Sequence, residues 1–523
     1  MTPPGEWRPR ANPWAIGASV SLATFMQVLD TTIVSVAMPH MAGSLSATPE
    51  EATWVLTSYL VANAIVLPAS GWLALRFGRK RLMLFSTALF TVASFVCGIA
   101  PTMASLILAR IVQGASGGAL QPLTQAILLE SFPPAKRGMS MAMFGVVIVV
   151  APVIGPTLGG WLTDSYSWRW VFNINIPIGI IAVLLMDRFV EDPPYIAHAR
   201  PGKIDASGLA FLILWLGALQ VVLDKGQQED WFSTAWITWF AVISACSMVA
   251  FLLRERHAAE PVVNLRVFRD RNFAVGTFLT GLIGAGMFSL ITMVPLFLQV
   301  LMGYSAQSSG LATTPRGLGS LVAMPVVGAL IGVVDSRWLV LAGTSLFGVS
   351  SYMLGNLNLE IAMGNIVFVN VIQGLGIAFT LVPLMTMTMA RLRNEQMGNA
   401  AGLYNLVRNL GGGMGISLVM TFVARRAQAR QAWMVGHLTP YDLAYQQRLA
   451  ATEAALTPLT GAPQAQQQAY AAMQGILIRQ ATLAAFLDVF RWIALAIALC
   501  GPIALLMKKG AARRGPGRSP AEL

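Results

Sequence analysis

The 523-residue sequence has few charged residues: only 11% are Asp, Glu, Lys or Arg, whereas soluble proteins average about 25%. Hydrophobic residues make up 55% of the chain. We therefore interpret it as an integral membrane protein. In a soluble protein the net charge of +12 would suggest nucleic-acid binding. Here the basic residues lie at the ends of apolar segments, as topology signals do, and we expect no nucleic-acid partner.

The sequence also has little of what disulfide-bonded proteins and enzymes need. Its three cysteines, Cys97, Cys246 and Cys500, lie within apolar segments, where a thiol behaves as a small hydrophobic group. There is no H-E-x-x-H motif, no pair of acids within an apolar segment and no Gly-rich phosphate loop. We therefore expect no metal site, no cofactor and no membrane-embedded enzyme activity.

Long apolar runs, in contrast, are abundant. A hydrocarbon core about 30 Å thick needs about 20 apolar residues per helix. Runs near that length predict fourteen membrane-spanning helices, grouped as six, two and six. The expected spans are residues 14–38, 53–74, 82–100, 103–129, 138–163, 170–190, 208–224, 234–253, 273–300, 311–334, 338–357, 361–390, 399–424 and 482–507.

The basic residues predict which side of the membrane each loop faces. An even number of spans places both termini on one side, and clusters such as Arg79–Arg81 and Arg254–Arg256 fall there. The positive-inside rule identifies that side as cytoplasmic. One cluster disagrees, because Arg425, Arg426 and Arg430 follow the thirteenth span on the predicted outer face. The N-terminus shows no cleavable signal, so we expect the first apolar run to remain as a span.

An internal repeat supports the grouping of the spans. Gln113-Gly114 recurs as Gln373-Gly374, about 260 residues later, and a Pro-Leu pair follows each, at Pro122 and Pro383. This repeat predicts a transporter arrangement of two pseudo-symmetric six-helix halves with a central site between them. The expected units are an N-terminal half at 1–200, two inserted helices at 201–260 and a C-terminal half at 261–523.

Residues 425–480 form a long stretch outside the predicted spans. The stretch is rich in Ala and Gln and contains few Gly, which predicts helices. We interpret it as a hairpin on the periplasmic face. The alternative is a passive solvated linker, since helix propensity alone identifies no partner.

Two Gly-rich motifs are candidates for gating and conformational change. The first, between spans two and three, contains Gly71, Gly78 and Arg79 and resembles the signature loop of the major facilitator superfamily, although Leu75 stands where that loop usually has an acid. The second, in the fifth span, is similar to a motif of drug antiporters. Its small residues allow close helix contact and its prolines bend the helix, although ordinary close packing is an alternative explanation. It comprises Gly145, Pro152, Gly155, Pro156, Gly159 and Gly160.

Three further segments, Leu29–Pro39, Trp168–Pro177 and Leu223–Phe232, make the resemblance more specific. Over nearly its whole length the chain resembles the fourteen-span drug:proton antiporters, most closely the EmrB type. The resemblance implies a multi-pass pump of the bacterial inner membrane that exports amphipathic compounds in exchange for protons, with a periplasmic adaptor and an outer-membrane channel as partners. The alternative is a proton-coupled importer or facilitator of a polar nutrient, which would have more polar pore-lining spans and no long outer hairpin.

Three residues are candidates for proton coupling. Asp30 lies inside the first span, where a carboxylate costs about 2.5–3.5 kcal/mol, so a functional role is expected unless it is a structural, hydrogen-bonded acid. Arg110 matches an embedded arginine of the family, and a permanent cation would favour the ionised form of a nearby acid. Its alternative role is that of an interfacial arginine. Glu130 ends the fourth span, a position that favours exposure to solvent.

The possible substrate cavity has four candidate residues. Arg408 matches an arginine typical of these antiporters, whereas Arg316 has no family match. With few embedded acids and several embedded cations, the cavity is expected to suit neutral or anionic amphiphiles better than organic dications. The four candidates are Gln113, Gln373, Arg316 and Arg408.

Overall fold

The computed structural model describes residues 9–132, 137–193, 205–226, 229–258, 265–331, 333–392, 397–436, 438–439 and 441–508. Every regular element within those ranges is a helix, which confirms the predicted all-α membrane fold. Within these described ranges, twelve helices are long and apolar enough to cross a membrane. The other two predicted spans coincide with α14 plus α15 and with α16. The predicted unit boundaries near residues 200 and 260 lie outside the described residues.

Among its described residues, the first half contains nine helices: α1 (Pro13–Ser44), α2 (Pro49–Ala52), α3 (Trp54–Phe77), α4 (Arg79–Gly98), α5 (Met103–Gly117), α6 (Leu120–Ser131), α7 (Arg137–Ser165), α8 (Trp170–Asn173) and α9 (Asn175–Phe189). The inserted pair is α11 (Ala206–Lys225) and α12 (Ala235–His257), with the short turn η2 (Trp231–Ser233) between them. The second half contains η3 (Leu265–Arg269), α13 (Arg271–Leu296), η4 (Phe297–Leu301), α14 (Ala306–Thr313), α15 (Pro315–Leu330), α16 (Ser336–Leu354), α17 (Met363–Met389), α18 (Met397–Val435), α19 (Leu443–Thr460) and α20 (Ala462–Ala504).

The helices of the two halves have corresponding neighbours. In the first half α1 packs against α7 and α9, α3 against α5, and α4 against α5 and α9. In the second half α13 packs against α18 and α20, α15 against α17, and α16 against α17 and α20. The internal repeat in the sequence therefore corresponds to two helical bundles of like architecture.

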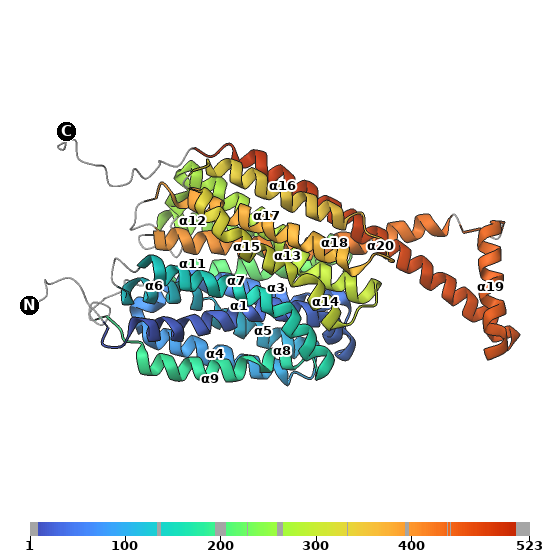
Figure 1. Ribbon diagram of the computed structural model, residues 1–523, viewed down its shortest axis with the longest axis horizontal. Coiled ribbons are helices and arrows are strands. Elements are labelled where there is room, and N and C mark those ends of the chain that lie inside the picture. Colours follow the sequence, from blue (N-terminus) through green and yellow to red (C-terminus); the bar gives the residue numbers. More distant parts are fainter. Residues whose placement is uncertain are drawn as a thin grey trace, which may run out of the picture.

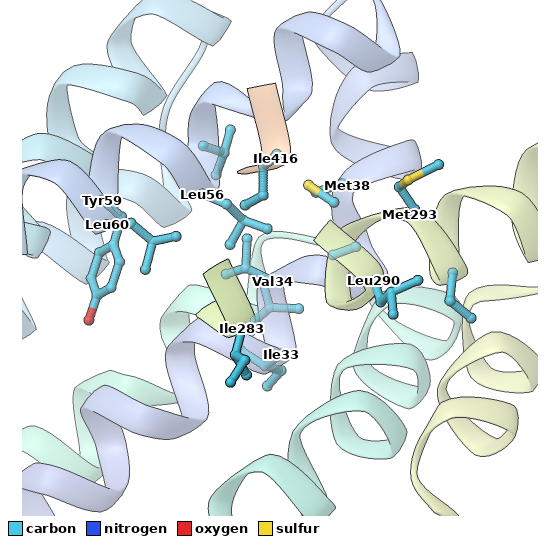
Figure 2. Close-up of a cluster of buried hydrophobic side chains, with 14 of the residues drawn as sticks. Ile33, Val34, Met38, Leu56, Tyr59, Leu60, Ile283, Leu290, Met293 and Ile416 are labelled. Carbon is cyan, nitrogen blue, oxygen red and sulfur yellow. The ribbon is translucent and has the colours of Figure 1, made fainter. Parts of the chain in front are cut away.

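The halves meet along two corresponding contacts, α7 with α14 and α3 with α18. Buried apolar side chains from both halves form one cluster. Figure 2 shows Ile33 and Leu56, from α1 and α3, near Ile283 of α13 and Ile416 of α18. Because burial of apolar surface stabilises by about 25 cal/mol per Å², this shared cluster holds the halves together in the conformation described.

The α7–α14 contact is closed by polar groups. The Asp164 carboxylate, at the end of α7, accepts hydrogen bonds from the backbone N–H groups of Ala306 (3.2 Å) and Gln307 (2.7 Å) at the start of α14. The hydroxyls of Thr157 and Thr314 are hydrogen-bonded at 2.5 Å across the same contact. An acid at a helix N-terminus satisfies N–H groups that lack partners within the helix, so this end of the interface is firmly joined.

The segment predicted as a hairpin is helical, as its composition indicates. Figure 1 shows α19 standing clear of the bundle, joined to it by the outer parts of α18 and α20. The sequence predicted that the last span begins at residue 482, but α20 is one continuous helix of 43 residues from Ala462. The reason is that the Ala- and Gln-rich stretch favours helix as strongly as the apolar run does. The periplasmic placement stays a prediction.

Candidate functional site

Two of the coupling candidates, Asp30 and Arg110, and one cavity candidate, Gln113, meet in one buried network within the first half. Asp30 lies midway along α1, and Arg110 and Gln113 lie one turn apart on α5. All three side chains are fully buried or nearly so. Nη1 of Arg110 donates hydrogen bonds to Oδ2 of Asp30 and, at 2.7 Å, to Oε1 of Gln113. A carboxylate in this apolar surrounding is therefore matched by a cation in direct contact.

Two further side chains, those of Asn175 and Ser94, join the network through hydrogen bonds. Nδ2 of Asn175, from the first residue of α9, donates to Oδ1 of Asp30 at 2.9 Å. Nε2 of Gln113 donates to the same oxygen at 3.1 Å and to Oγ of Ser94, on α4, at 2.6 Å. Four helices, α1, α4, α5 and α9, thus contribute to one cluster around the Asp30 carboxylate. Any change in the charge of Asp30 would be felt by all of them.

The Arg110 guanidinium is held rigidly by additional contacts. Its Nε donates to the backbone carbonyl of Val55 at 2.9 Å. Its central carbon lies 4.2 Å from the ring centroid of Tyr59 and 5.6 Å from that of Phe172. These contacts show that Arg110 is an embedded cation rather than an interfacial one that snorkels to solvent. The contact with α3 also connects the charge pair to a helix that forms the interface between the halves.

Glu130, the third coupling candidate, lies elsewhere. Its side chain is 28% exposed and forms an ion pair with Arg79, the arginine of the signature loop. The position at a span end favoured solvent exposure, but tertiary contact with the loop covers most of the side chain. Glu130 therefore belongs with the signature loop rather than with Asp30.

The signature loop is anchored to the end of the first half. Gly78 has φ +86°, a conformation that favours glycine, and a Cβ there would lie 2.5 Å from Oδ2 of Asp192. The backbone N–H of Lys80 donates to Asp192 at 2.9 Å, and its ammonium lies 3.4 Å from Asp187. The loop thus joins α3 and α4 to the residues around the end of α9, and Gly78 makes this close approach possible.

The Gly-rich motif of α7 lies where α7 touches both halves. A Cβ on Gly159 would lie 2.6 Å from the carbonyl oxygen of Ile33 on α1, and Gly155 faces the same helix. A Cβ on Gly160 would lie 2.7 Å from Cα of Gln307 on α14. Side chains at these positions would force the helices apart. The motif therefore permits close contact both beside the Asp30 network and across the interface.

Other motif residues show weaker constraints. Pro152 and Pro156 lie within α7. Gly71 and Gly145 have open space where a Cβ would be placed, so nothing in the described packing requires glycine at either position.

The remaining cavity candidates lie in the second half. Nη1 of Arg316, on α15, donates to Oε1 of Gln373, on α17, at 3.4 Å. Arg408, on α18, packs its aliphatic part against the position of Gly284 on α13. Gln113 is separated from these three because it belongs to the buried Asp30 network. The assignment of these four residues to a substrate cavity stays a prediction.

A second carboxylate within the bundle, that of half-buried Asp224, was not selected from the sequence. Its Oδ2 accepts hydrogen bonds from Thr57 of α3 (3.0 Å) and Gln220 of α11 (2.8 Å), and its Oδ1 accepts one from Ser417 of α18. The inserted helix α11 is thereby bonded to both halves at once. Asp224 lies in a segment that carried the family resemblance, and that was the available signal. Ser94 gave no signal, because its role depends only on tertiary contact.

Two helical halves of like architecture, with corresponding contacts between them and a charge pair embedded in the first half, are typical of a multi-pass membrane transporter. The model of the Major Facilitator Superfamily matches residues 20–416, and the chain belongs to that superfamily. It is 39% identical to the multidrug export protein EmrB of Haemophilus influenzae and 37% identical to EmrB of Escherichia coli K12, in both cases over 81% of this chain and 83% of the relative. The colistin resistance protein EmrB of Acinetobacter baumannii is 28% identical over 97% and 98%.

Solved structures agree on the fold. An inward-facing, occupied bacterial homologue of the human lysosomal transporter Spinster superposes with a TM-score of 0.63 at 14% identity, over 96% of this chain and 98% of that chain. The xylose transporter XylE of E. coli, in its inward-open conformation, gives a TM-score of 0.54 at 13% identity, over 78% and 90%. At such identities the likeness shows the fold alone.

Proposed function

We propose that this protein is a proton-coupled antiporter that exports amphipathic compounds across the bacterial inner membrane. The observation that carries the proposal is the buried Asp30–Arg110 pair. Burying ionisable groups inside a membrane bundle costs free energy, so such groups mark functional sites. The names of the curated relatives support export rather than import. The same pair supports proton coupling, since a proton on Asp30 would remove the charge that holds Arg110.

In the proposed cycle Asp30 is the principal proton site and Arg110 sets its proton affinity. Protonation would weaken the contacts from Arg110, Gln113 and Asn175 together, and so loosen α1 from α5 and α9. A proton entering down a potential of about 150 mV releases about 3.5 kcal/mol. At one proton per molecule this supports a gradient of about 300-fold for a neutral substrate, so one titrating acid is sufficient.

Asp30→Asn tests the coupling. Asparagine is isosteric with the protonated acid, a state that the cycle must visit, so the fold and substrate binding should persist. The amide cannot release a proton, so in liposomes pH-driven export should be lost while counterflow is kept. Retention of both activities would remove Asp30 from the mechanism and leave Glu130 as the next candidate. Uptake in the opposite direction under the same gradient would favour the importer.

We further propose that the hairpin docks a periplasmic adaptor that leads to an outer-membrane channel. The support is its shape: α19 and the adjoining helix ends project beyond the bundle, where a partner could reach them (Figure 1). Removing α19 with the outer turns of α18 and α20 should abolish drug resistance in cells but leave transport into everted vesicles nearly intact. An unrelated helical hairpin of equal length is the control. Unchanged resistance in the shortened variant would mean that the segment is a passive linker.

A further inference from the structure

A cavity of about 530 Å³ lies within the second half, between α13, α18 and α20. Its volume is typical of sites for small molecules, which range from about 300 to 1,000 Å³. The walls are largely apolar, with Gly286 on α13, Leu418 and Phe422 on α18, and Trp492 on α20. The rings of Phe422 and Trp492 stack with centroids 6.3 Å apart. We call this cavity the lateral groove; none of its lining residues belongs to the Asp30 network.

One end of the lateral groove is cationic. Arg425 and Arg426 line it just beyond the apolar part of α18, at the end of the bundle where the hairpin begins. The Arg426 guanidinium lies 5.6 Å from the ring centroid of Trp492. The carboxylate at this end, Asp488, is engaged by Arg430 at 2.9 Å and by Arg491 at 3.9 Å. Two arginines thus contact the one acid that lines the cavity, and two more line the same end, so the local charge is positive.

The deeper part of the groove is apolar apart from one hydroxyl. Fully buried Ser289, on α13, lines the cavity, and its Oγ has no hydrogen-bond partner among the described residues. From Arg425 to Gly415 the groove follows ten residues of α18, or roughly 15 Å of helix. A narrow apolar slot with cations at its mouth fits a molecule with an apolar chain and an anionic head. A neutral amphiphile would gain only the apolar contacts, and a cationic one would be repelled.

We propose that the lateral groove binds a single-chain amphiphile with an anionic headgroup, with the headgroup at Arg425 and Arg426 and the chain between α13, α18 and α20. The proposal rests on the proposed function only in treating this ligand as a substrate that enters from the membrane. The proposed site lies on the membrane side of the second half, separate from the interface between the halves. It prefers ligands with an anionic headgroup.

Quenching of Trp492 fluorescence measures binding directly. Purified protein in nanodiscs is titrated with 12-bromododecanoate. The fluorescence of the Trp492→Phe variant is subtracted, which removes the contribution of the other 13 of the 14 tryptophans. We expect saturable quenching that depends on Trp492. The Arg425→Gln/Arg426→Gln double variant should bind the carboxylate at least about tenfold more weakly, because charge-assisted contacts are lost. Affinity for neutral 12-bromododecanol should be unchanged.

Two matched variants make the outcome decisive. Arg448→Gln removes one arginine charge from exposed α19 and should leave binding intact, whereas Ala496→Phe fills the groove and should abolish binding of both probes. Equal carboxylate affinity in the double variant and the wild type would overturn the proposal. Equal quenching by a brominated zwitterionic phospholipid would also overturn it, by showing a general lipid contact. The binding assay needs no proton gradient. The binding proposal can therefore be confirmed when coupling through Asp30 is refuted, and it can be refuted when that coupling is confirmed.

Discussion

The Asp30 and Arg110 side chains are buried together, so the stability that each contributes depends on the other. Arg110→Met would leave the carboxylate without its cation and should lower the free energy of unfolding by about 3–5 kcal/mol. Adding Asp30→Asn removes the remaining charge and should recover most of the loss. Thermal unfolding in detergent measures both variants. Losses that simply add would show that the two groups do not interact energetically.

Asp205, just before the span formed by α11, gives a pH-dependent prediction. Burial raises the pKa of its carboxyl, but hydrogen bonds from the Gly208 N–H (3.0 Å) and the Ser207 hydroxyl (2.7 Å), together with Arg254, bring the pKa below its ordinary value. The lower folded-state pKa stabilises the protein above about pH 4, and that stabilisation is lost as the pH falls through the folded-state pKa. Asp205→Asn should therefore cost about 1 kcal/mol near neutral pH and little in acid.

Melting temperatures of the wild type and Asp205→Asn, measured from about pH 7 down to about pH 3, provide the test. The two curves should converge in acid. Curves that stay parallel would mean that the carboxylate contributes through its cap geometry alone and not through its charge.

The sequence predicted the central residues of the buried network but not all of the side chains that surround them. Asp30 and Arg110 stand out because charge within an apolar run is rare. Ser94 does not stand out, since serine occurs throughout the spans and only the packing of α4 on α5 brings it to Gln113. Asp224 was missed because an acid near the end of an apolar run, next to Lys225, resembles an ordinary interfacial residue.

Among the elements, α11 has the least usual position, since it is an inserted helix that is hydrogen-bonded to both halves through Asp224. Asp224→Ala would remove the acceptor that Thr57, Gln220 and Ser417 share. We expect a loss of about 1–3 kcal/mol in stability, measured by thermal unfolding. Glu360→Ala, which changes an exposed acid between α16 and α17, is the control and should leave the stability unchanged. An equally small effect of both variants would mean that Asp224 does not hold α11 in place.

Element boundaries were predictable where composition changes with structure. The spans end where apolar runs meet Gly, Pro or charge, and most of their limits follow from that rule. The rule fails at α18 and α20, which continue past the apolar run because Ala and Gln sustain a helix in water. The break between α5 and α6 at Gly118-Ala119 was likewise invisible within one apolar run.

For the whole molecule, the fold was accessible from the sequence because the thickness of the bilayer fixes the length of each span and because the two halves repeat. The pairing of α7 with α14 and of α3 with α18 was not accessible, since it depends on which small residues allow close approach. The lateral groove was equally hidden, as its walls come from three helices distant in the chain.

Because α20 is one continuous helix, a rotation of its membrane part also moves its outer end. Its 43 residues span about 65 Å, of which roughly the first 20 residues, or about 30 Å, extend toward the hairpin. If the second half tilts by about 10° during transport, rigid geometry moves the far end of that arm by about 5 Å. A partner bound to α19 would therefore be displaced in every cycle, so the hairpin would transmit the conformational change of the bundle directly to that partner.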